Sequence, residues 1–126
     1  RYGIWPHDSG FSAAVPRAGM RFCRLPFTAP GILAQPAFLW TDRKNVVAET
    51  VKPCEEAQYA IIVRLYECEG TRTSAHIHTG FPLLRAETCD MMERTLEPVS
   101  LKTPLPFAPF EIKTLKLYYQ TEKGIL

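Results

Sequence analysis

The sequence predicts an all-β protein, folded as an antiparallel β-sandwich in a single region that spans residues 1–126. Eleven prolines are spread along the chain, and each limits the length of a helix because its ring fixes φ and its nitrogen carries no hydrogen. β-Branched and aromatic residues lie in short stretches between these breaks, which is typical of strands. Apolar residues nowhere recur at helical spacing over a useful length, and only residues 90–96 are expected to form a helical turn.

The N-terminal part of the chain is expected to contribute two short strands. The first covers residues 1–5 and ends at Pro6. Residues 7–10 then form a turn, because Asp, Ser and Gly favour turn geometry. The second strand covers residues 20–27, and residues 28–36 form a loop.

The chain is expected to be a fragment of a larger polypeptide. It begins at Arg1 without a methionine, directly in strand-like sequence. The loop at residues 28–36 is a candidate sub-boundary. Residues 1–27 are then expected to belong to a preceding sheet of the parent protein.

The strongest strand signal covers residues 58–69. Its apolar residues divide between two faces, with Ile61, Val63 and Leu65 on one and Ile62 and Tyr66 on the other. A strand that is apolar on both faces usually lies in the centre of a sandwich. A neighbouring strand is predicted at residues 46–52, and Gly70 and Thr71 are expected to turn the strong strand into a hairpin with residues 73–79.

Three further strands are predicted in the C-terminal half, at residues 83–88, 99–101 and 110–119. In the last of these, Phe110 and Ile112 alternate with polar residues, whereas the later apolar residues follow the opposite parity. This change near Thr114 predicts a β-bulge.

Charge and cysteine content exclude several classes of protein. The 15 basic and 13 acidic residues give a net charge of +2, and no basic stripe or patch indicates a nucleic-acid or membrane partner. The sequence contains no apolar run of membrane-spanning length. The four cysteines show no C-x-x-C pair, and the single asparagine, Asn45, is not in a glycosylation sequon. Free thiols in a reducing, cytoplasmic compartment are therefore expected.

His76 and His78 are the sharpest local feature. Residues at i and i+2 of a strand point to the same face, and two imidazoles on one face can bind a metal. A third ligand is needed, and the sequence offers Glu69, Asp90 or His7 without placing any of them. The simpler interpretation is an exposed, polar strand face.

Other residue patterns also have a structural explanation. The run His7-Asp8-Ser9 is a turn, because triad members must converge from separate segments. Aromatic residues could stack on sugars, but in a sandwich they more often form the core; the candidates are Trp5, Trp40, Tyr2, Tyr66, Phe81, Phe107 and Phe110. The acidic pairs Glu55/Glu56 and Asp90/Glu93 are expected on solvated surfaces. Arg64 lies in an apolar strand and is expected to pair with a carboxylate, for which Glu67, Glu49 and Glu111 are the candidates.

Five segments, in order, resemble the C-terminal β-domain of glycoside hydrolase family 38. They are residues 2–7 (YGIWPH), 46–52 (VVAETVK), 62–70 (IVRLYECEG), 89–94 (CDMMER) and 109–115 (PFEIKTL). No single segment is specific, but their order and spacing cover almost the whole chain. The RLYE pattern resembles the bacterial and cytosolic branch of the family, and the implied fold is a galactose-mutarotase-like sandwich.

The resemblance implies a parent α-mannosidase with a retaining, zinc-dependent mechanism. Its zinc ligands and aspartate nucleophile lie in an N-terminal α/β domain, and no segment of this chain matches those motifs. No catalytic, cofactor-binding or metal residue is therefore assigned here, and the chain alone is not expected to be an enzyme.

The expected role is a non-catalytic C-terminal domain that supports the catalytic domain and lines the rim of the substrate cleft. Its partners would be the catalytic and central domains of the same parent, with mannosides bound through the parent. The alternative is a free-standing carbohydrate-binding or metal-binding module that uses His76 and His78. The sequence leaves the oligomeric state open.

Overall fold

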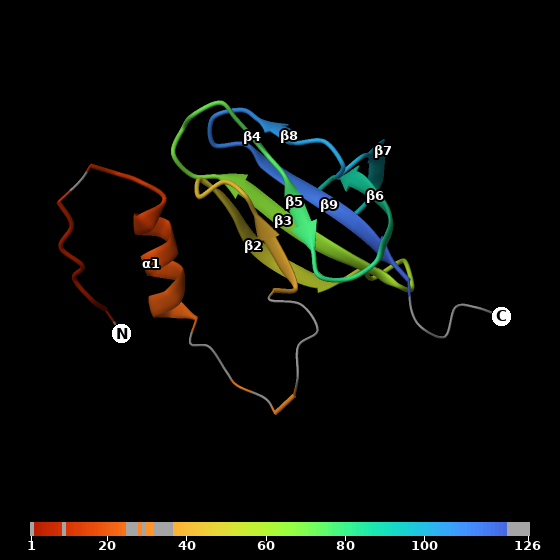
Figure 1. Ribbon diagram of the computed structural model, residues 1–126, viewed down its shortest axis with the longest axis horizontal. Coiled ribbons are helices and arrows are strands. Elements are labelled where there is room, and N and C mark those ends of the chain that lie inside the picture. The colour runs from red at the N-terminus through yellow and green to blue at the C-terminus, as the bar shows by residue number, and fades with distance from the viewer. Residues whose placement is uncertain (1, 9, 25–27, 29, 32–36, 121–126) are drawn as a thin grey trace.

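The computed structural model describes residues 2–8, 10–24, 28, 30–31 and 37–120 of the chain. Within these residues the protein forms a two-layer β-sandwich with one helix at its side (Figure 1). The elements in chain order are α1 (Ala14–Cys23), β1 (Leu39–Thr41), β2 (Val46–Pro53), β3 (Ala60–Glu67), β4 (Thr73–Ala75), β5 (Ile77–Thr79), β6 (Leu83–Cys89), β7 (Thr95–Val99), β8 (Leu105–Phe107) and β9 (Ile112–Tyr119).

One layer is a five-stranded antiparallel sheet with the order β2-β3-β9-β6-β7. The other layer consists of two short antiparallel pairs, β1-β5 and β4-β8. The strands predicted at residues 46–52, 58–69 and 83–88 are confirmed as β2, β3 and β6. The all-β sandwich predicted from the sequence is therefore confirmed.

The main core lies between the two layers. Strand β3 contributes Ile61, Val63 and Leu65, as the alternation predicts, and β9 contributes Leu115 and Leu117 opposite them. The short pairs supply the other wall, through Ala75, Ile77, Leu105 and Phe107. Burial of each large apolar side chain stabilises the fold by roughly 1.5–3 kcal/mol.

The outer face of the five-stranded sheet is covered at two places. At one end, Ile62 packs with Cys54, which directly follows β2, and with Cys89, the last residue of β6. At the other end, Tyr66 and Val47 pack against Ala13 and Met20, at the beginning and within the body of α1. Strand β3 is therefore buried on both faces, which places it in the centre of the fold.

The predicted hairpin between residues 58–69 and 73–79 is wrong. Both edges of β3 are already occupied, because β2 pairs on one side and β9 on the other. The chain therefore leaves this sheet after β3 and enters the opposite layer, where β4 pairs with β8 and β5 with β1. The alternation within the segment is correct, since Ala75 and Ile77 are buried.

The predicted bulge near Thr114 is also wrong. The register between β3 and β9 is continuous from Tyr66↔Ile112 to Ala60↔Tyr118. The parity changes because Phe110 belongs to a turn with a positive φ of 58° and not to the strand. Both faces of β9 are then buried around Thr114. The structure places bulges in β2 and β6 instead.

Two shorter expectations also fail in the C-terminal half. Residues 90–96 do not form a helical turn, because the Asp90 carboxylate accepts hydrogen bonds from the amides of Met92 and Arg94 and closes a tight turn before β7. The strand predicted at residues 99–101 begins earlier, as Thr95–Val99, because it pairs with β6.

The largest error in the N-terminal part is the strand predicted at residues 20–27. Residues 20–23 belong to α1, and residues 25–27 lie outside the described part of the chain. Pro16 fits this helix because it lies in the first turn, where an amide hydrogen has no helical partner. The segment from Tyr2 to Trp5 is extended but pairs with no strand, so the strand predicted there is not formed within the described residues.

Candidate functional site

The two histidines singled out from the sequence lie on one face, as predicted. His76 lies between β4 and β5, His78 lies in β5, and their ring centroids are 6.0 Å apart. Asp42 holds His76 at two atoms: its Oδ1 accepts the backbone N–H of His76 at 2.8 Å, and its Oδ2 lies 3.0 Å from Nδ1. These two hydrogen bonds, the side-chain bond first, lower the pKa of Asp42.

Trp40 adds an aromatic surface beside the histidines. It lies opposite His78 in the β1-β5 pair, and the two rings stack with centroids 5.2 Å apart and planes 15° apart. We call Trp40, Asp42, His76 and His78 the histidine face. The sequence offered no signal for the contribution of Asp42, because only the pairing of β1 with β5 brings it to His76.

The histidine face does not provide a third metal ligand. Of the three suggested residues, Glu69 accepts the amide of Ala13, Asp90 closes its own turn, and His7 lies beside the ring of Trp5. Within the described residues, no group of three His, Cys, Asp or Glu could hold a metal ion. These residues therefore do not fit a zinc site.

The predicted sugar-stacking aromatics do not form one surface. Phe107 is in the main core and Tyr66 packs near α1. The others are distributed over the N-terminal segment, the histidine face and two separate loops; they are Tyr2, Trp5, Trp40, Phe81 and Phe110. The interpretation that the aromatic residues form the core is therefore correct for some of them, such as Phe107, but not for all.

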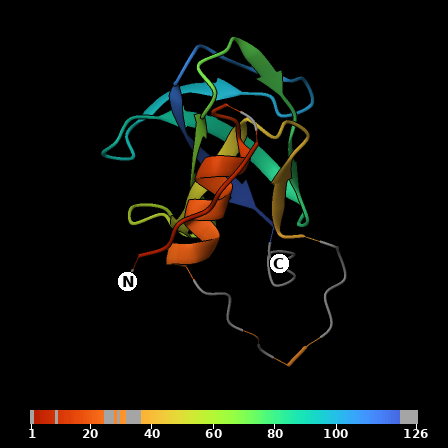
Figure 2. The same cartoon turned by 90° about the vertical axis from the view of Figure 1, so that its left-hand side faces the viewer.

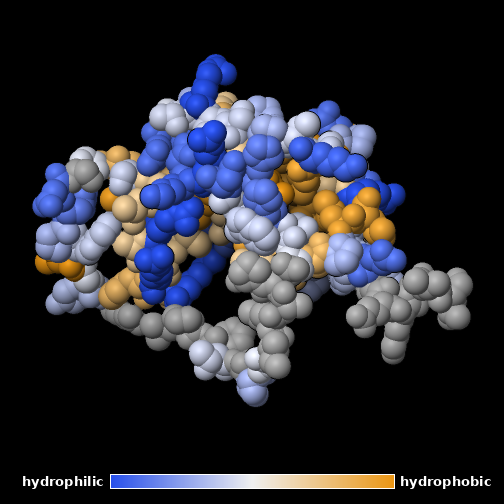
Figure 3. All heavy atoms as spheres, viewed as in Figure 1, coloured by the Kyte–Doolittle hydropathy of each residue, from blue (hydrophilic) through white to orange (hydrophobic). Residues whose placement is uncertain are grey.

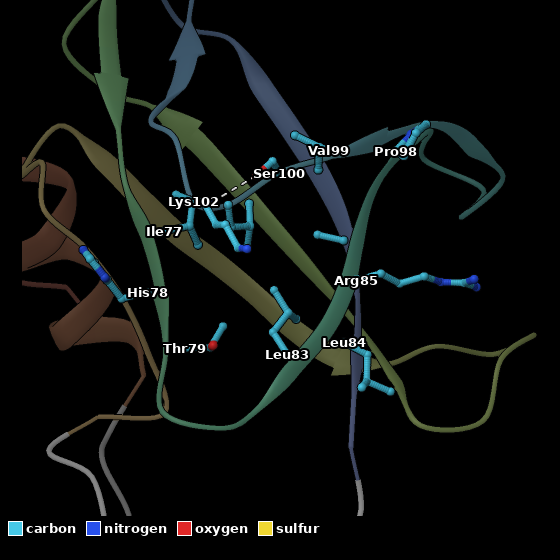
Figure 4. Close-up of a pocket in the computed structure, with 12 residues that line it drawn as sticks. Ile77, His78, Thr79, Leu83, Leu84, Arg85, Pro98, Val99, Ser100 and Lys102 are labelled. Atoms are coloured by element: carbon cyan, nitrogen blue, oxygen red, sulfur yellow. Dashed lines mark hydrogen bonds between the residues drawn. The ribbon is translucent and has the colours of Figure 1, made fainter.

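A groove of about 640 Å³ opens between the two layers next to His78. Thr79 and Leu83 point into the space between β5 and β6, whereas Arg85 points away from it (Figure 4). The polar residues that line the groove include Ser100 and Lys102, but none of its lining residues is Asp or Glu. Glycoside hydrolysis needs a pair of carboxyl groups, and the described lining of this groove does not provide one.

The solvated surface expected for the two acidic pairs is found for Glu55 and Glu56, which are exposed, but it is wrong for Glu93, which is buried and bound by Lys52. Lys52 binds both Glu55 and Glu93, and these hydrogen bonds raise its pKa to about 12. The pKa of Glu93 is lowered, mainly because its carboxylate accepts a hydrogen bond from Lys52. Burial would raise the pKa of Asp90, but hydrogen bonds from Arg94 and Met92 outweigh it and lower the pKa. A catalytic acid needs a raised pKa, so Asp90 and Glu93, whose pKa values are lowered, do not fit this role.

The predicted ion pair of Arg64 is wrong. Arg64 Nε donates to the hydroxyl of Thr114 at 3.4 Å. The buried charge of this strand is Glu67, a residue with 0% exposure. Its carboxylate accepts six hydrogen bonds, from Asn45 Nδ2, Thr71 Oγ1 and the amides of Glu69, Gly70, Thr71 and Phe110.

Glu67 could have been identified from the sequence by the reasoning that was applied to Arg64. Both are charged residues in an apolar strand, and only paired or well hydrogen-bonded charges are buried. Burial would raise the pKa of Glu67, but the bonds from Phe110, Glu69, Asn45 and Gly70 outweigh it and hold the pKa at about 2. The carboxylate therefore fixes the turn after β3 and the turn before β9 and has no free oxygen for chemistry.

Comparison with known proteins identifies the fold. Residues 45–115 match the model of the glycosyl hydrolases family 38 C-terminal beta sandwich domain. The chain belongs to this family. The matched residues run from the beginning of β2 to the middle of β9, so they contain the main sheet but neither α1 nor the N-terminal segment.

Two relatives of this family 38 domain are named Alpha-mannosidase 2C1. The mouse protein is 31% identical over 136 residues, which cover 95% of this chain and 13% of the relative. The human protein is 33% identical over 135 residues, which cover 94% of this chain and 13% of the relative. The family 38 domain thus spans about one eighth of the length of these relatives. In the described part of the chain, no helix has the length and apolar character needed to cross a membrane.

Proposed function

We propose that this family 38 domain is the non-catalytic C-terminal domain of a longer α-mannosidase. The observation that carries the proposal is the match to the family's C-terminal sandwich together with alignment to only 13% of two proteins named as α-mannosidases. The groove and the acidic pairs support it, because neither provides a carboxyl pair suited to glycoside hydrolysis.

In this proposal the domain contributes packing and rigid loops. The catalytic and central domains of the same polypeptide are its partners, and they bind the terminal α-linked mannose that is hydrolysed. Loops on a rigid β-scaffold can line the rim of a substrate cleft. Any zinc would belong to the catalytic domain, since the residues described here do not fit a zinc site. The four free thiols support a reducing, cytoplasmic location for the parent.

Activity assays of two proteins test the proposal. The full-length polypeptide is expected to hydrolyse a nitrophenyl α-mannoside, to lose this activity in a chelator and to regain it with zinc. The 126-residue chain is expected to show no hydrolysis with or without zinc. Hydrolysis by the 126-residue chain would contradict the proposal, and so would an inactive full-length protein. Cell fractionation that placed the parent outside the cytosol would contradict the proposed cytoplasmic location.

The histidine face supports a second candidate, a carbohydrate-binding or metal-binding module. The stacked, partly exposed Trp40 and His78 and the fixed imidazole of His76 favour it. Calorimetric titrations with methyl α-mannoside and with zinc test it, and the variant His76→Ala/His78→Ala is the control. Binding by the wild type that the variant loses would support this candidate, whereas flat titrations of both proteins would exclude it.

A further inference from the structure

Two groups of large apolar side chains are exposed on this domain. One is the N-terminal segment, with Ile4 at 90% and Trp5 at 50% exposure, which lies beside the half-buried Val15, Ala18 and Phe22 of α1. The other is the turn between β6 and β7, which exposes Met91 and Met92. Apolar surface that is exposed on an isolated domain often marks an interface, so each group is a candidate docking surface.

The first group forms a groove, which lies on the side of α1 that faces away from the sandwich. The extended N-terminal segment runs along that side of the helix, and two perpendicular views agree on this arrangement (Figures 1 and 2). Moderately hydrophobic residues cover the helix at the left of the surface view, next to hydrophilic ones (Figure 3). The groove has a volume of about 470 Å³ and is lined by Gly3, Ile4, Trp5, His7, Val15, Ala18, Gly19 and Phe22.

The helix that forms one wall of this groove packs against the sandwich through one side only. None of the residues of α1 is fully buried. Met20 packs toward the sheet near Tyr66, whereas Val15, Ala18 and Phe22 line the groove on the other side. Residues at these spacings form one apolar stripe on a helix, and a stripe of this kind normally packs against another element.

The rim of the groove is positively charged. Trp5 also borders a second hollow, which is lined by Arg17, Arg21 and Lys44. Arg17 donates to the backbone carbonyl of Lys44. Within the described part of the chain, neither the guanidinium of Arg21 nor the ammonium of Lys44 pairs with a carboxylate. An occupant with apolar side chains and an acidic border would complement this surface.

The backbone of the N-terminal segment is also unpaired. The amides of Gly3, Ile4 and Trp5 donate no hydrogen bond to another described residue. An extended segment with free backbone groups can be added to the edge of a sheet in a partner. The same segment therefore provides both apolar side chains and hydrogen-bonding groups for docking.

The lengths of the relatives offer a candidate for the occupant of this surface. The relatives align with 94–95% of this chain, so the alignment includes most of the N-terminal part, yet the family's sandwich model covers only residues 45–115. The rest of each relative, about seven eighths of its length, lies outside the alignment. We infer that the groove of α1 and the N-terminal segment binds another domain of the same longer polypeptide, through an apolar, acid-bordered surface of that domain. This inference rests on the proposed function, because it requires a parent protein.

The turn with Met91 and Met92 is less suited to this role. Asp90 closes the turn by accepting hydrogen bonds from the amides of Met92 and Arg94 and from Arg94 Nε. Neither methionine lines any of the hollows described above. The turn therefore offers a matched control, since it is exposed and apolar but is not expected to dock.

Hydrogen exchange of the full-length polypeptide, followed by mass spectrometry, tests the inference without a substitution. Without docking, the amides of residues 3–5 should exchange at nearly the rate of an unstructured chain. With docking, we expect exchange at least about a hundredfold slower, because opening of the interface must precede it. The amide of Met91 should remain fast in the same sample. Fast exchange at residues 3–5 would overturn the inference.

A pair of full-length variants then assigns the protection to the groove. Trp5→Ser/Phe22→Ser should lose the protection of residues 3–5, whereas Met91→Ser/Met92→Ser should keep it. Loss of protection in the second variant alone would show that the methionine turn is the docking surface and would overturn the inference.

The mannosidase activity of the wild-type polypeptide separates the two proposals. An inactive polypeptide with slow exchange at residues 3–5 would remove the proposed function but retain the docking surface. An active polypeptide with fast exchange there would remove the docking surface alone.

Discussion

Strand β3 and helix α1 are of similar length but differ in how much of them the fold buries. Six of the eight residues of β3 are buried, and the strand contacts partners on both edges and both faces. None of the ten residues of α1 is fully buried, and its outer side contacts only an extended segment that is itself exposed. The two elements lie in the same chain, but only β3 is enclosed by other elements of the described residues.

The difference teaches how a fragment of a larger protein can be recognised. The sandwich has a closed core, a hydrogen-bonded buried charge at Glu67 and a continuous register between its central strands β3 and β9. The N-terminal part has an amphipathic helix, an open groove and unpaired backbone groups. The first set of properties is typical of an independently stable unit, and the second is what the proposed docking surface requires.

Truncating one apolar side chain in each element tests this comparison most strongly. Leu65→Ala in β3 is expected to lower the free energy of unfolding by about 3 kcal/mol, because it removes buried contacts and leaves a cavity. Val15→Ala in α1 should change it by less than about 0.5 kcal/mol, because the side chain lines an open groove. Urea denaturation followed by far-ultraviolet circular dichroism measures both. Equal losses would show that α1 is as integral to the fold as β3.

Replacing the buried carboxylate tests whether the sandwich depends on Glu67. Glu67→Gln should lower the free energy of unfolding by about 3 kcal/mol, since it removes the charge and turns an amide group toward backbone donors. Glu69→Gln is the matched control, because its exposed side chain accepts one amide, from Ala13, and glutamine retains that acceptor. A loss for Glu69→Gln as large as that for Glu67→Gln would contradict the assignment.

The stability of the wild type should also depend on pH through Glu67, with a smaller change in the free energy of unfolding than the substitution causes. The pKa of Glu67 is about 2 in the folded protein and about 4.5 in the unfolded chain, so its contribution is present above pH 4.5 and is lost as the pH falls toward 2. Between pH 5 and pH 3 the wild type should lose about 2 kcal/mol through this group. Denaturation series at both pH values should show a correspondingly smaller loss for Glu67→Gln, and equal losses would contradict the prediction.

The fold class could be predicted because it depends on short-range patterns. Alternating apolar residues in β2, β3 and β6 and frequent prolines identified a sandwich without any tertiary information. The face assignment of Ile61, Val63 and Leu65 followed from the two-residue period of a strand. The helix was missed because the frequent prolines were expected to limit helices, whereas Pro16 lies in the first helical turn, where proline is tolerated.

Strand pairing and the candidate site depended on long-range contacts. A hairpin between β3 and the next strand was locally reasonable, but β9, which lies some fifty residues away, competes for the same edge. Likewise, nothing near His76 predicts that Asp42 binds it, because the two residues meet only when β1 pairs with β5. The functional residues that sequence analysis missed are those brought together by pairing between distant segments.

The sequence by itself determined the sandwich class, the apolar faces of the strands and the family to which the segments belong. These properties follow from the period of side chains along a strand and from residues close together in the chain. The tertiary structure alone decided which strands are neighbours, that Glu67 and not Arg64 is the buried charge, and that the outer side of α1 and the N-terminal segment line an open groove. Those outcomes depend on which distant groups compete for the same edge, donor or face, and local patterns do not contain that information.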